Sequence, residues 1–314
     1  MTTKPDVLIV APMFPAAIEA IEHEFSAHKL YQAQDHKGLI ASIGDRVRGI
    51  ATVGTVGAKA ELIEALPKLE IISCFGVGYD GVDVETARKH GVIVTNTPDV
   101  LTDCVADLTL SLLLAVARRI CAADRYVRSG RWLQGPMPLS SKVGGKLCGI
   151  VGFGRIGSAI AKRAQAFNMD IAYHGPRPKK DVVYPYYPSL IELARDADYL
   201  VLTVPGGSET RHLVGAAVID ALGPEGTLIN VARGSVVDET ALVEALKSGR
   251  LGAAGLDVYE NEPRVPDALL TMDNVVLLPH IGSATRETRA AMGELTVANL
   301  RAHFAGQPVL TRVA

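Results

Sequence analysis

The chain has 314 residues, of which 48% are hydrophobic and 21% are charged. This composition is ordinary for globular proteins and excludes an intrinsically disordered chain, and the length exceeds what one hydrophobic core usually serves, so we expect two domains. Thirty-two basic and thirty-four acidic residues leave a net charge of -2, which gives no electrostatic reason to expect a nucleic acid or an anionic membrane as a partner.

The N-terminal residues contain a short apolar run broken by prolines, which predicts a first strand and not a signal peptide. The longest apolar-rich stretch, residues 108–117, has about half the length that a membrane-spanning helix needs. We therefore expect a soluble, cytoplasmic protein. Four widely spaced cysteines form no C-x-x-C pair, so we expect buried free thiols and no metal site at Cys74, Cys104, Cys121 and Cys148.

Short apolar runs alternate with helical patterns from end to end. The predicted strands span residues 7–11, 71–75, 92–95, 147–151, 170–173, 199–204, 227–231, 252–258 and 275–278. Continuous apolar strands separated by helices predict an α/β protein with parallel sheets covered on both faces. Residues 102–121 predict one long, largely buried helix after a turn, which places a domain crossing near Pro98. The last predicted helix, about residues 286–304, could pack on either domain.

A glycine-rich turn follows the strand at residues 147–151. Gly152, Gly154 and Gly157 form the pattern G-x-G-x-x-G, followed by a helix and a second strand. In a dinucleotide-binding unit the first glycine allows the tight turn, the second lets the backbone approach a pyrophosphate, and the third lets the helix pack on the strand. The free N–H groups at the helix start, near Arg155 and Ile156, then face the phosphates. The alternative is a turn that binds no ligand.

The end of the next strand lacks the acidic residue that NAD enzymes use to bind the ribose hydroxyls. The chain instead continues as His174-Gly175-Pro176-Arg177, and the first carboxylate is Asp181. A carboxylate at the strand end would repel a 2′-phosphate, whereas Arg177 and the following lysines would attract one. The sequence therefore predicts NADP(H) in preference to NAD(H), and the alternative is a solvated basic loop.

Three later strands are each followed by a residue with useful chemistry, namely Arg233, Glu262 and His280. Ligands of open α/β sheets gather at such strand ends. A guanidinium can bind a carboxylate in bidentate fashion, a histidine can donate a proton as hydride reaches a carbonyl carbon, and a neighbouring carboxylate favours the imidazolium. The three residues suit reduction of a 2-oxo acid. Taken singly, they could also be a surface ion-pair partner, a loop carboxylate and an ordinary histidine.

Several blocks in the same order carry a family resemblance: GIVGFGRIG, NVARGSVVDETALVEAL, GLDVYENEP and NVVLLPHIGSAT. With them, the sequence resembles the D-2-hydroxy acid dehydrogenases, and among these the NADP-dependent hydroxypyruvate, glyoxylate and hydroxyphenylpyruvate reductases. The resemblance implies Arg233, Glu262 and His280 as catalytic residues, and Asp257 as the partner of the nicotinamide carboxamide. The coenzyme contacts we expect are Gly152, Gly154, Arg155, Ile156, Gly157, His174, Gly175, Pro176, Arg177, Val204, Pro205, Thr210, Val231 and Asp257. The substrate contacts we expect are Val53, Gly54, Val77, Gly78, Arg233, His280 and Ser283.

The resemblance also implies a topology. A Rossmann coenzyme domain of residues 99–285 would be inserted into a flavodoxin-like substrate domain of residues 1–98 and 286–314, with the active site in a cleft that closes by hinge motion. Relatives are usually homodimers joined through their coenzyme domains. The segment 128–133 resembles a loop that reaches the partner's active site in some relatives, so Trp132 would have that role or would simply pack at the interface.

One departure and several alternatives accompany the resemblance. Many relatives carry Pro-Leu-Thr where this chain has Val204-Pro205-Gly206, although the coenzyme could still lie over the first two of these residues.

Formate dehydrogenases have glutamine at the position of Glu262, which disfavours that activity. A phosphoglycerate dehydrogenase, a hydroxyphenylpyruvate reductase and a non-catalytic dinucleotide-sensing protein remain as alternatives. The preferred prediction is reduction of hydroxypyruvate or glyoxylate to the D-2-hydroxy acid by NADPH, with His280 as the general acid.

Overall fold

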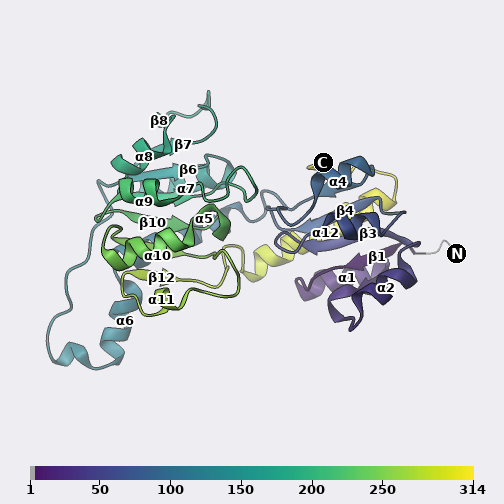
Figure 1. The fold of residues 1–314 in the computed structure, drawn as a ribbon, viewed down its shortest axis with the longest axis horizontal. Coiled ribbons are helices and arrows are strands. Elements are labelled where there is room, and N and C mark those ends of the chain that lie inside the picture. Colours follow the sequence, from purple (N-terminus) through teal and green to yellow (C-terminus); the bar gives the residue numbers. More distant parts are fainter. Residues whose placement is uncertain (1–3) are drawn as a thin grey trace. The chain divides into compact units, whose positions relative to one another are not determined.

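The computed structural model describes residues 4–314, and the chain forms two compact units (Figure 1). Unit 1 contains the residues up to Leu101 together with Thr285–Ala314, and unit 2 contains Thr102–Ala284. No helix in the described part of the chain has both the length and the apolar character that crossing a membrane requires. Each unit has its own sheet and its own hydrophobic core, so each is described by itself.

Unit 1 is built on five parallel strands in the order β2-β1-β3-β4-β5, which is the flavodoxin-like order. The strands are β1 (Asp6–Ile9), β2 (Ser26–Lys29), β3 (Val47–Val53), β4 (Ile71–Phe75) and β5 (Ile93–Thr95). Because successive side chains alternate between the two faces of a strand, Leu8 joins one hydrophobic core while Val7 and Ile9 join the other. The sheet is therefore buried on both faces.

Two helices cover one face of this sheet and three shorter ones lie on the other. They are α1 (Pro15–Glu24), α2 (His36–Ile43), α3 (Ala60–Glu64), α4 (Val84–Lys89) and α12 (Arg286–Phe304), with a 3-10 turn η1 (Leu30–Gln32). Helix α12 packs on β4 beside α1 through Val297 and Leu300. The last helix, which periodicity alone left unplaced, thus belongs to unit 1.

Unit 2 contains seven parallel strands in the order β12-β11-β10-β9-β6-β7-β8. The strands are β6 (Leu147–Val151), β7 (Asp170–His174), β8 (Tyr186–Tyr187), β9 (Tyr199–Leu202), β10 (Thr227–Asn230), β11 (Ala253–Leu256) and β12 (Val275–Leu277). The strand order reverses between β6 and β9, which is the switch point at which doubly wound sheets bind dinucleotides. With both sheets entirely parallel, the predicted fold class is confirmed.

The helices of unit 2 cover both faces of its sheet. They are α5 (Thr102–Ala117), α6 (Ile120–Arg128), α7 (Arg155–Ala166), α8 (Leu190–Asp196), α9 (Ala216–Leu222), α10 (Glu239–Ser248) and α11 (Asp267–Leu270), with 3-10 turns η2 (Arg131–Leu133) and η3 (Gly234–Val236). Helices α5 and α7 contribute to one core, while α8, α9 and α10 contribute to the other.

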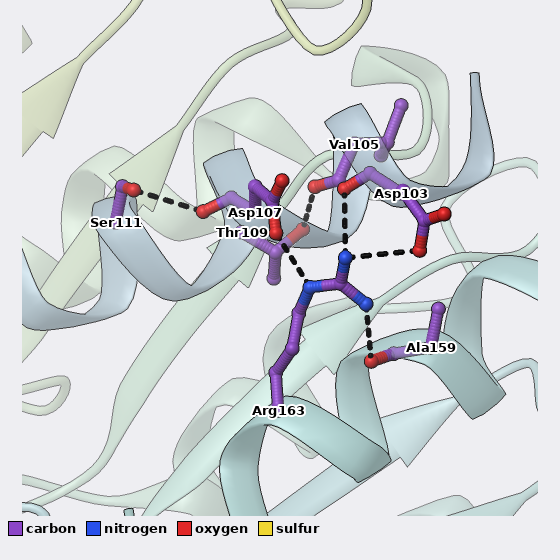
Figure 2. A network of polar contacts seen from close by, with 7 residues as sticks. All are labelled: Asp103, Val105, Asp107, Thr109, Ser111, Ala159 and Arg163. Atoms are coloured by element: carbon purple, nitrogen blue, oxygen red, sulfur yellow. Dashed lines mark hydrogen bonds and ion pairs between the residues drawn. The ribbon is translucent and has the colours of Figure 1, made fainter. Parts of the chain in front are cut away.

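An ion-pair network holds α7 against α5. The guanidinium of Arg163 donates from Nε to Asp107 Oδ1 at 2.6 Å and from one terminal nitrogen to Asp103 Oδ1 at 2.9 Å. Figure 2 shows this side chain reaching from α7 to two carboxylates on α5, while its other terminal nitrogen binds the Ala159 carbonyl oxygen. Because α7 starts at the glycine turn, this clamp also fixes the helix that carries the turn.

The prediction of a single helix over residues 102–121 is wrong. The chain forms two helices, α5 and α6, because Arg119 takes a left-handed conformation with φ 51° and ends the first one. The residues of α5 alternate between buried and exposed in the ordinary way, whereas α6 has no buried residue. Figure 1 shows α6 and the segment after it extending from the body of unit 2.

The prediction of four buried thiols holds for only two of them. Cys74 and Cys148 are buried, Cys104 is partly exposed, Cys121 is exposed, and none is in a disulfide. Burial raises the pKa of the Cys148 thiol to about 12, so this group stays protonated and behaves as a small apolar side chain.

Candidate active site

A histidine and a glutamate meet at the carboxyl end of the sheet in unit 2. His280 Nδ1 and Glu262 Oε2 are 2.7 Å apart, and the two side chains are 35% and 29% exposed. Partial burial acts to raise the pKa of Glu262, but the hydrogen bond and charge of His280, the Tyr259 N–H and the charge of Arg233 outweigh it and lower that pKa. Glu262 is thus an ionised partner that orients the imidazole.

The backbone around His280 is fixed by one buried carboxylate. Asp257 is 1% exposed, and its two oxygens accept hydrogen bonds from Ile281 N at 2.7 Å and Gly282 N at 2.8 Å. The Asp257 carbonyl oxygen accepts a third from His280 N at 2.8 Å. His280 has a positive φ of 56°, which non-glycine residues adopt where the surroundings impose it. The structure therefore assigns Asp257 a clamping function that the sequence did not indicate.

The loop that carries Arg233 is held by an asparagine that the sequence reasoning missed. Asn230, the last residue of β10, donates from Nδ2 to the Arg233 carbonyl oxygen at 3.0 Å and accepts from Ala232 N at 3.0 Å. The next residue, Gly234, passes so close to the chain that a Cβ there would lie 1.8 Å from the Tyr259 carbonyl carbon. Only glycine permits this approach, which sets the Arg233 loop against the loop of Glu262. The sequence does contain a signal for Asn230, because it is a polar residue at the end of an otherwise apolar strand.

Tyr259 is the other protic side chain beside the pair, and its surroundings exclude it as a proton donor. Burial raises its pKa to about 12, and its hydroxyl donates to the Leu256 and Leu278 carbonyl oxygens at 3.3 and 3.0 Å. Next to the pair lies an apolar pocket of about 250 Å³ lined mainly by Tyr259, Val265, Leu270, Leu277 and Leu278.

The glycine turn has the form that a dinucleotide requires. Gly152 has φ 91°, and a Cβ on Gly157 would lie 2.5 Å from the Gly152 carbonyl oxygen, so both positions need glycine. A Cβ on Gly154 would meet nothing within 4 Å, which leaves the backbone open at the start of α7. The start of a helix, with the positive end of its dipole, suits a pyrophosphate. Thr203, also missed in the sequence, supports the turn by donating from Oγ1 to the Gly152 carbonyl oxygen.

The basic loop after β7 is exposed but well anchored. Residues 176–180 are all exposed, so the predicted coenzyme residues Pro176 and Arg177 face solvent. Two tyrosines hold the loop, because the Tyr173 hydroxyl accepts from Lys179 N at 2.8 Å and the Tyr186 hydroxyl donates to the Gly175 carbonyl oxygen at 3.0 Å. His174 is turned toward β8, where Nδ1 lies 2.9 Å from the Tyr187 carbonyl oxygen.

The remaining predicted coenzyme residues of unit 2 also follow strands at this edge. Val204 and Pro205 come after β9, and the Thr210 hydroxyl donates back to the Pro205 carbonyl oxygen at 2.6 Å, which closes this loop on itself. Val231 follows β10 and is partly exposed. Ser283, a predicted substrate contact, comes directly after the turn that Asp257 clamps and is partly exposed.

The predicted substrate residues of unit 1 lie on two neighbouring loops. Val53 ends β3, and the loop with Val77 and Gly78 follows β4, its partner strand. The Gly54 carbonyl oxygen accepts a hydrogen bond from Gly81 N at 2.9 Å, which joins the two loops. Unit 1 thus brings these four predicted residues to the carboxyl edge of its own sheet.

A larger cavity, of about 520 Å³, lies at the opposite end of the sheet in unit 2. It is lined by residues at the amino ends of the strands, including Lys146, Asp198, Thr227 and Asn274. Its lining contains two ion pairs, Lys146 Nζ with Asp198 Oδ1 at 2.6 Å and Arg125 with Asp273 Oδ1 at 3.4 Å. Among residues 4–314, no group of three or more His, Cys, Asp or Glu side chains is placed to hold a metal ion.

The sequence of this chain is similar to that of known proteins over almost its whole length. The sequence profile described as "D-isomer specific 2-hydroxyacid dehydrogenase, NAD binding domain" matches residues 110–282. This chain belongs to the D-isomer-specific 2-hydroxyacid dehydrogenase family. It is 48% identical over 307 residues, 98% of both chains, to glyoxylate/hydroxypyruvate reductase A HPR2 of Arabidopsis thaliana. It is 50% identical, with the same coverage, to hydroxyphenylpyruvate reductase of Plectranthus scutellarioides.

A solved structure of the family superposes on the whole chain. It is an NADPH-dependent glyoxylate/hydroxypyruvate reductase from Sinorhizobium meliloti in complex with NADP and malonate, with a TM-score of 0.93 and 44% identity. The match covers 99% of this chain and 97% of the other. The resemblance seen in the sequence motifs is thereby confirmed at the level of the family.

Proposed function

We propose that this dehydrogenase reduces a small 2-oxo acid, with hydroxypyruvate or glyoxylate preferred, to the D-2-hydroxy acid with NADPH as the coenzyme. The observation that carries the proposal is the His280–Glu262 pair, 2.7 Å apart at the carboxyl edge of a sheet whose glycine turn suits a dinucleotide. The relatives named for glyoxylate and hydroxypyruvate reduction support the substrate class.

The residues of unit 2 fit the coenzyme. Gly154 leaves the backbone open at the start of α7, where the helix dipole favours an anion, so we assign the pyrophosphate to this turn. Gly175, Arg177 and the lysines after it would take the adenosine 2′-phosphate. We assign Asp257 to the nicotinamide carboxamide, using oxygen lone pairs that its two backbone hydrogen bonds leave over. When bound, the coenzyme supplies the hydride for the carbonyl carbon.

The protein's own groups supply the binding and the proton. Arg233 holds the substrate carboxylate, and the N–H groups of Val77 and Gly78 donate to the same anion. His280 polarises the carbonyl oxygen and gives it a proton as negative charge develops there. Glu262 fixes which nitrogen faces the substrate, because it binds Nδ1 and leaves Nε2 for the carbonyl oxygen.

We also propose that the protein acts as a homodimer through the arm formed by α6 and residues 129–140. Large apolar side chains on this arm are exposed to a degree that is unusual for a monomer: Trp132 by 68%, Leu133 by 94% and Leu139 by 97%. A second copy of the chain would cover them. Sedimentation should give about twice the 33.3 kDa chain mass, and a Leu133→Glu and Leu139→Glu double variant should sediment as a monomer.

The test of the activity is to follow coenzyme oxidation with NADPH and NADH in parallel, using hydroxypyruvate, glyoxylate and hydroxyphenylpyruvate as substrates. We expect the fastest oxidation with NADPH and one of the two small substrates. Preference for hydroxyphenylpyruvate would assign the protein to the alternative reductase. Absence of turnover with every 2-oxo acid would contradict the proposal and favour a dinucleotide-sensing protein.

Coenzyme choice has its own test in Gly175→Asp. A Cβ at this position meets no atom within 4 Å, so a side chain can start here without a clash. Repulsion of a 2′-phosphate should lower the preference for NADPH over NADH by about tenfold or more. The neutral, similarly sized Gly175→Asn is the matched control and should change the ratio much less. An unchanged ratio in Gly175→Asp would contradict the assignment of the phosphate to this loop.

A further inference from the structure

Two consecutive peptide groups in the loop after β4 have their carbonyl oxygens held by the two residues that follow β5. The Gly76 carbonyl oxygen accepts from Thr97 N at 2.9 Å, and the Val77 carbonyl oxygen accepts from Asn96 Nδ2 at 2.8 Å. Gly76 N also donates to Thr97 Oγ1 at 3.1 Å. Because Asn96 and Thr97 follow β5, the partner of β4, they support the loop after β4 along one side.

Peptide geometry fixes the direction of the N–H groups in the same loop. A trans peptide group points its N–H opposite to its carbonyl, and both of these peptide groups are trans. Turning the two carbonyls toward Thr97 and Asn96 therefore turns the N–H groups of Val77 and Gly78 away from them. Within residues 4–314, neither N–H donates to a protein acceptor. Two adjacent N–H groups aimed in this way suit an anionic ligand.

Asn96 is itself held rigidly, so it can impose this direction. Its side chain is buried, with 6% of the residue exposed, and its carbonyl oxygen accepts from Thr311 Oγ1 at 2.6 Å. Thr311 Oγ1 in turn accepts from Asn299 Nδ2 at 2.8 Å, and Asn299 Oδ1 accepts from the N–H of Thr311 at 3.2 Å. Asn299 lies on α12 and is fully buried. The chain of bonds thus ties the loop to the hydrophobic core.

We propose that Asn96 is a positioning residue for substrate binding: it holds the Val77 carbonyl so that the Val77 and Gly78 N–H groups face the carboxylate of a 2-oxo acid. The backbone N–H of Thr97 holds the preceding peptide group in the same way, through the Gly76 carbonyl oxygen. Asn96 does not contact the substrate, and its effect passes through the loop. The inference rests on the proposed function, because it assumes that these two N–H groups bind the substrate carboxylate.

The test is Asn96→Asp, which keeps the side-chain shape but replaces the donor that faces the Val77 carbonyl by a carboxylate oxygen. The two oxygens repel, so the peptide group should leave its position. Hydrogen bonds to a charged group are individually strong, so we expect KM for hydroxypyruvate or glyoxylate to rise about 10- to 100-fold. The kcat should fall much less, and KM for NADPH should stay unchanged. Asn96→Ala removes the donor without adding charge and serves if the first variant does not fold.

Thr95→Val is the matched control. Thr95 is buried one residue before Asn96, and its hydroxyl donates at 3.2 Å to Ser73 Oγ, away from the loop. This variant loses a buried hydrogen bond as well, so it reports general loss of stability. We expect its KM values to match those of the wild type.

The outcomes separate the inference from the proposed function. A wild type that reduces 2-oxo acids, together with Asn96 variants whose substrate KM is unchanged, would overturn the positioning role and leave the function intact. An equal rise of KM in Thr95→Val would also overturn it, because the effect would then be general. A wild type that reduces no 2-oxo acid would overturn the function and this inference together.

Discussion

The two ends of the seven-stranded sheet differ in what they contain. The amino end has the larger cavity, about 520 Å³, and its lining contains the Lys146–Asp198 and Arg125–Asp273 ion pairs. The carboxyl end has a pocket of about 250 Å³, yet it gathers the glycine turn, the His280–Glu262 pair and the Asp257 clamp. Our proposed active site therefore rests on convergent, backbone-fixed polar groups and not on cavity volume.

The largest effect should come from removing the proton donor of the carboxyl end. His280→Ala should lower kcat for 2-oxo acid reduction by about 10²- to 10⁴-fold, the usual contribution of general acid catalysis. Coenzyme affinity, measured by fluorescence titration, should change little, which separates loss of chemistry from loss of fold. Undiminished turnover in this variant would eliminate the proposed role of His280.

The glycine turn offers two substitutions that should behave differently. Gly157→Ala places a Cβ 2.5 Å from the Gly152 carbonyl oxygen, so we expect the free energy of unfolding to fall by about 1–3 kcal/mol. Gly154→Ala meets no protein atom, so thermal unfolding should be nearly unchanged while NADPH affinity falls about tenfold or more. Retained NADPH affinity in Gly154→Ala would contradict a pyrophosphate at this turn.

A smaller effect should appear in the pH dependence of stability. The folded-state pKa of Glu262 is below its ordinary value of 4.5, so the ionised group stabilises the fold above pH 4.5, and this contribution is lost as pH falls through the folded-state pKa. Burial raises the pKa of Asp257, so ionisation of this group has the opposite effect on stability. Asp257 is present in both the wild type and a Glu262→Gln variant, so its contribution largely cancels when the two are compared. The excess stability of wild type over Glu262→Gln, from urea unfolding, should therefore shrink on acidification. A constant difference would contradict the ionised pair.

The smallest effect on activity should come from the amino end. Asp198 accepts hydrogen bonds from Lys146 Nζ at 2.6 Å and from Leu147 N at 2.8 Å. Asp198→Asn should lower the free energy of unfolding by about 1 kcal/mol, measured by urea unfolding. Its kcat and KM should equal those of the wild type, because nothing at that end takes part in the proposed chemistry. A large loss of kcat with an intact fold would contradict the claim that the amino end takes no part in the reaction.

Much of the fold could be predicted from the sequence because buried parallel strands are continuous apolar runs. The predicted bounds of β4 and β6 match the observed Ile71–Phe75 and Leu147–Val151. The edge strand β2 escaped prediction because its residues, Ser26–Lys29, are partly exposed and mixed in polarity. The break at Arg119 also escaped, since a left-handed arginine has no local sequence signal.

The site was predictable where its chemistry lies in side-chain type and spacing, as in the glycine turn and the arginine, glutamate and histidine. The residues that orient these groups were not. Asn230, Asp257 and Asn96 act by holding particular backbone atoms, and such bonds join segments far apart in the sequence. Periodicity and motif spacing carry no information about these bonds. The resemblance pointed to Asp257 as a coenzyme contact, but the backbone-holding roles of all three residues became visible only in the folded chain.

The most direct test of which end is functional is hydrogen–deuterium exchange with and without saturating NADPH. We expect protection in peptides that cover Gly152–Ser158 and the basic loop at residues 175–180, with no change around Lys146, Asp198 and Asn274. Protection confined to the latter peptides would place the coenzyme at the larger cavity and contradict the assignment of the active site to the carboxyl end of the sheet.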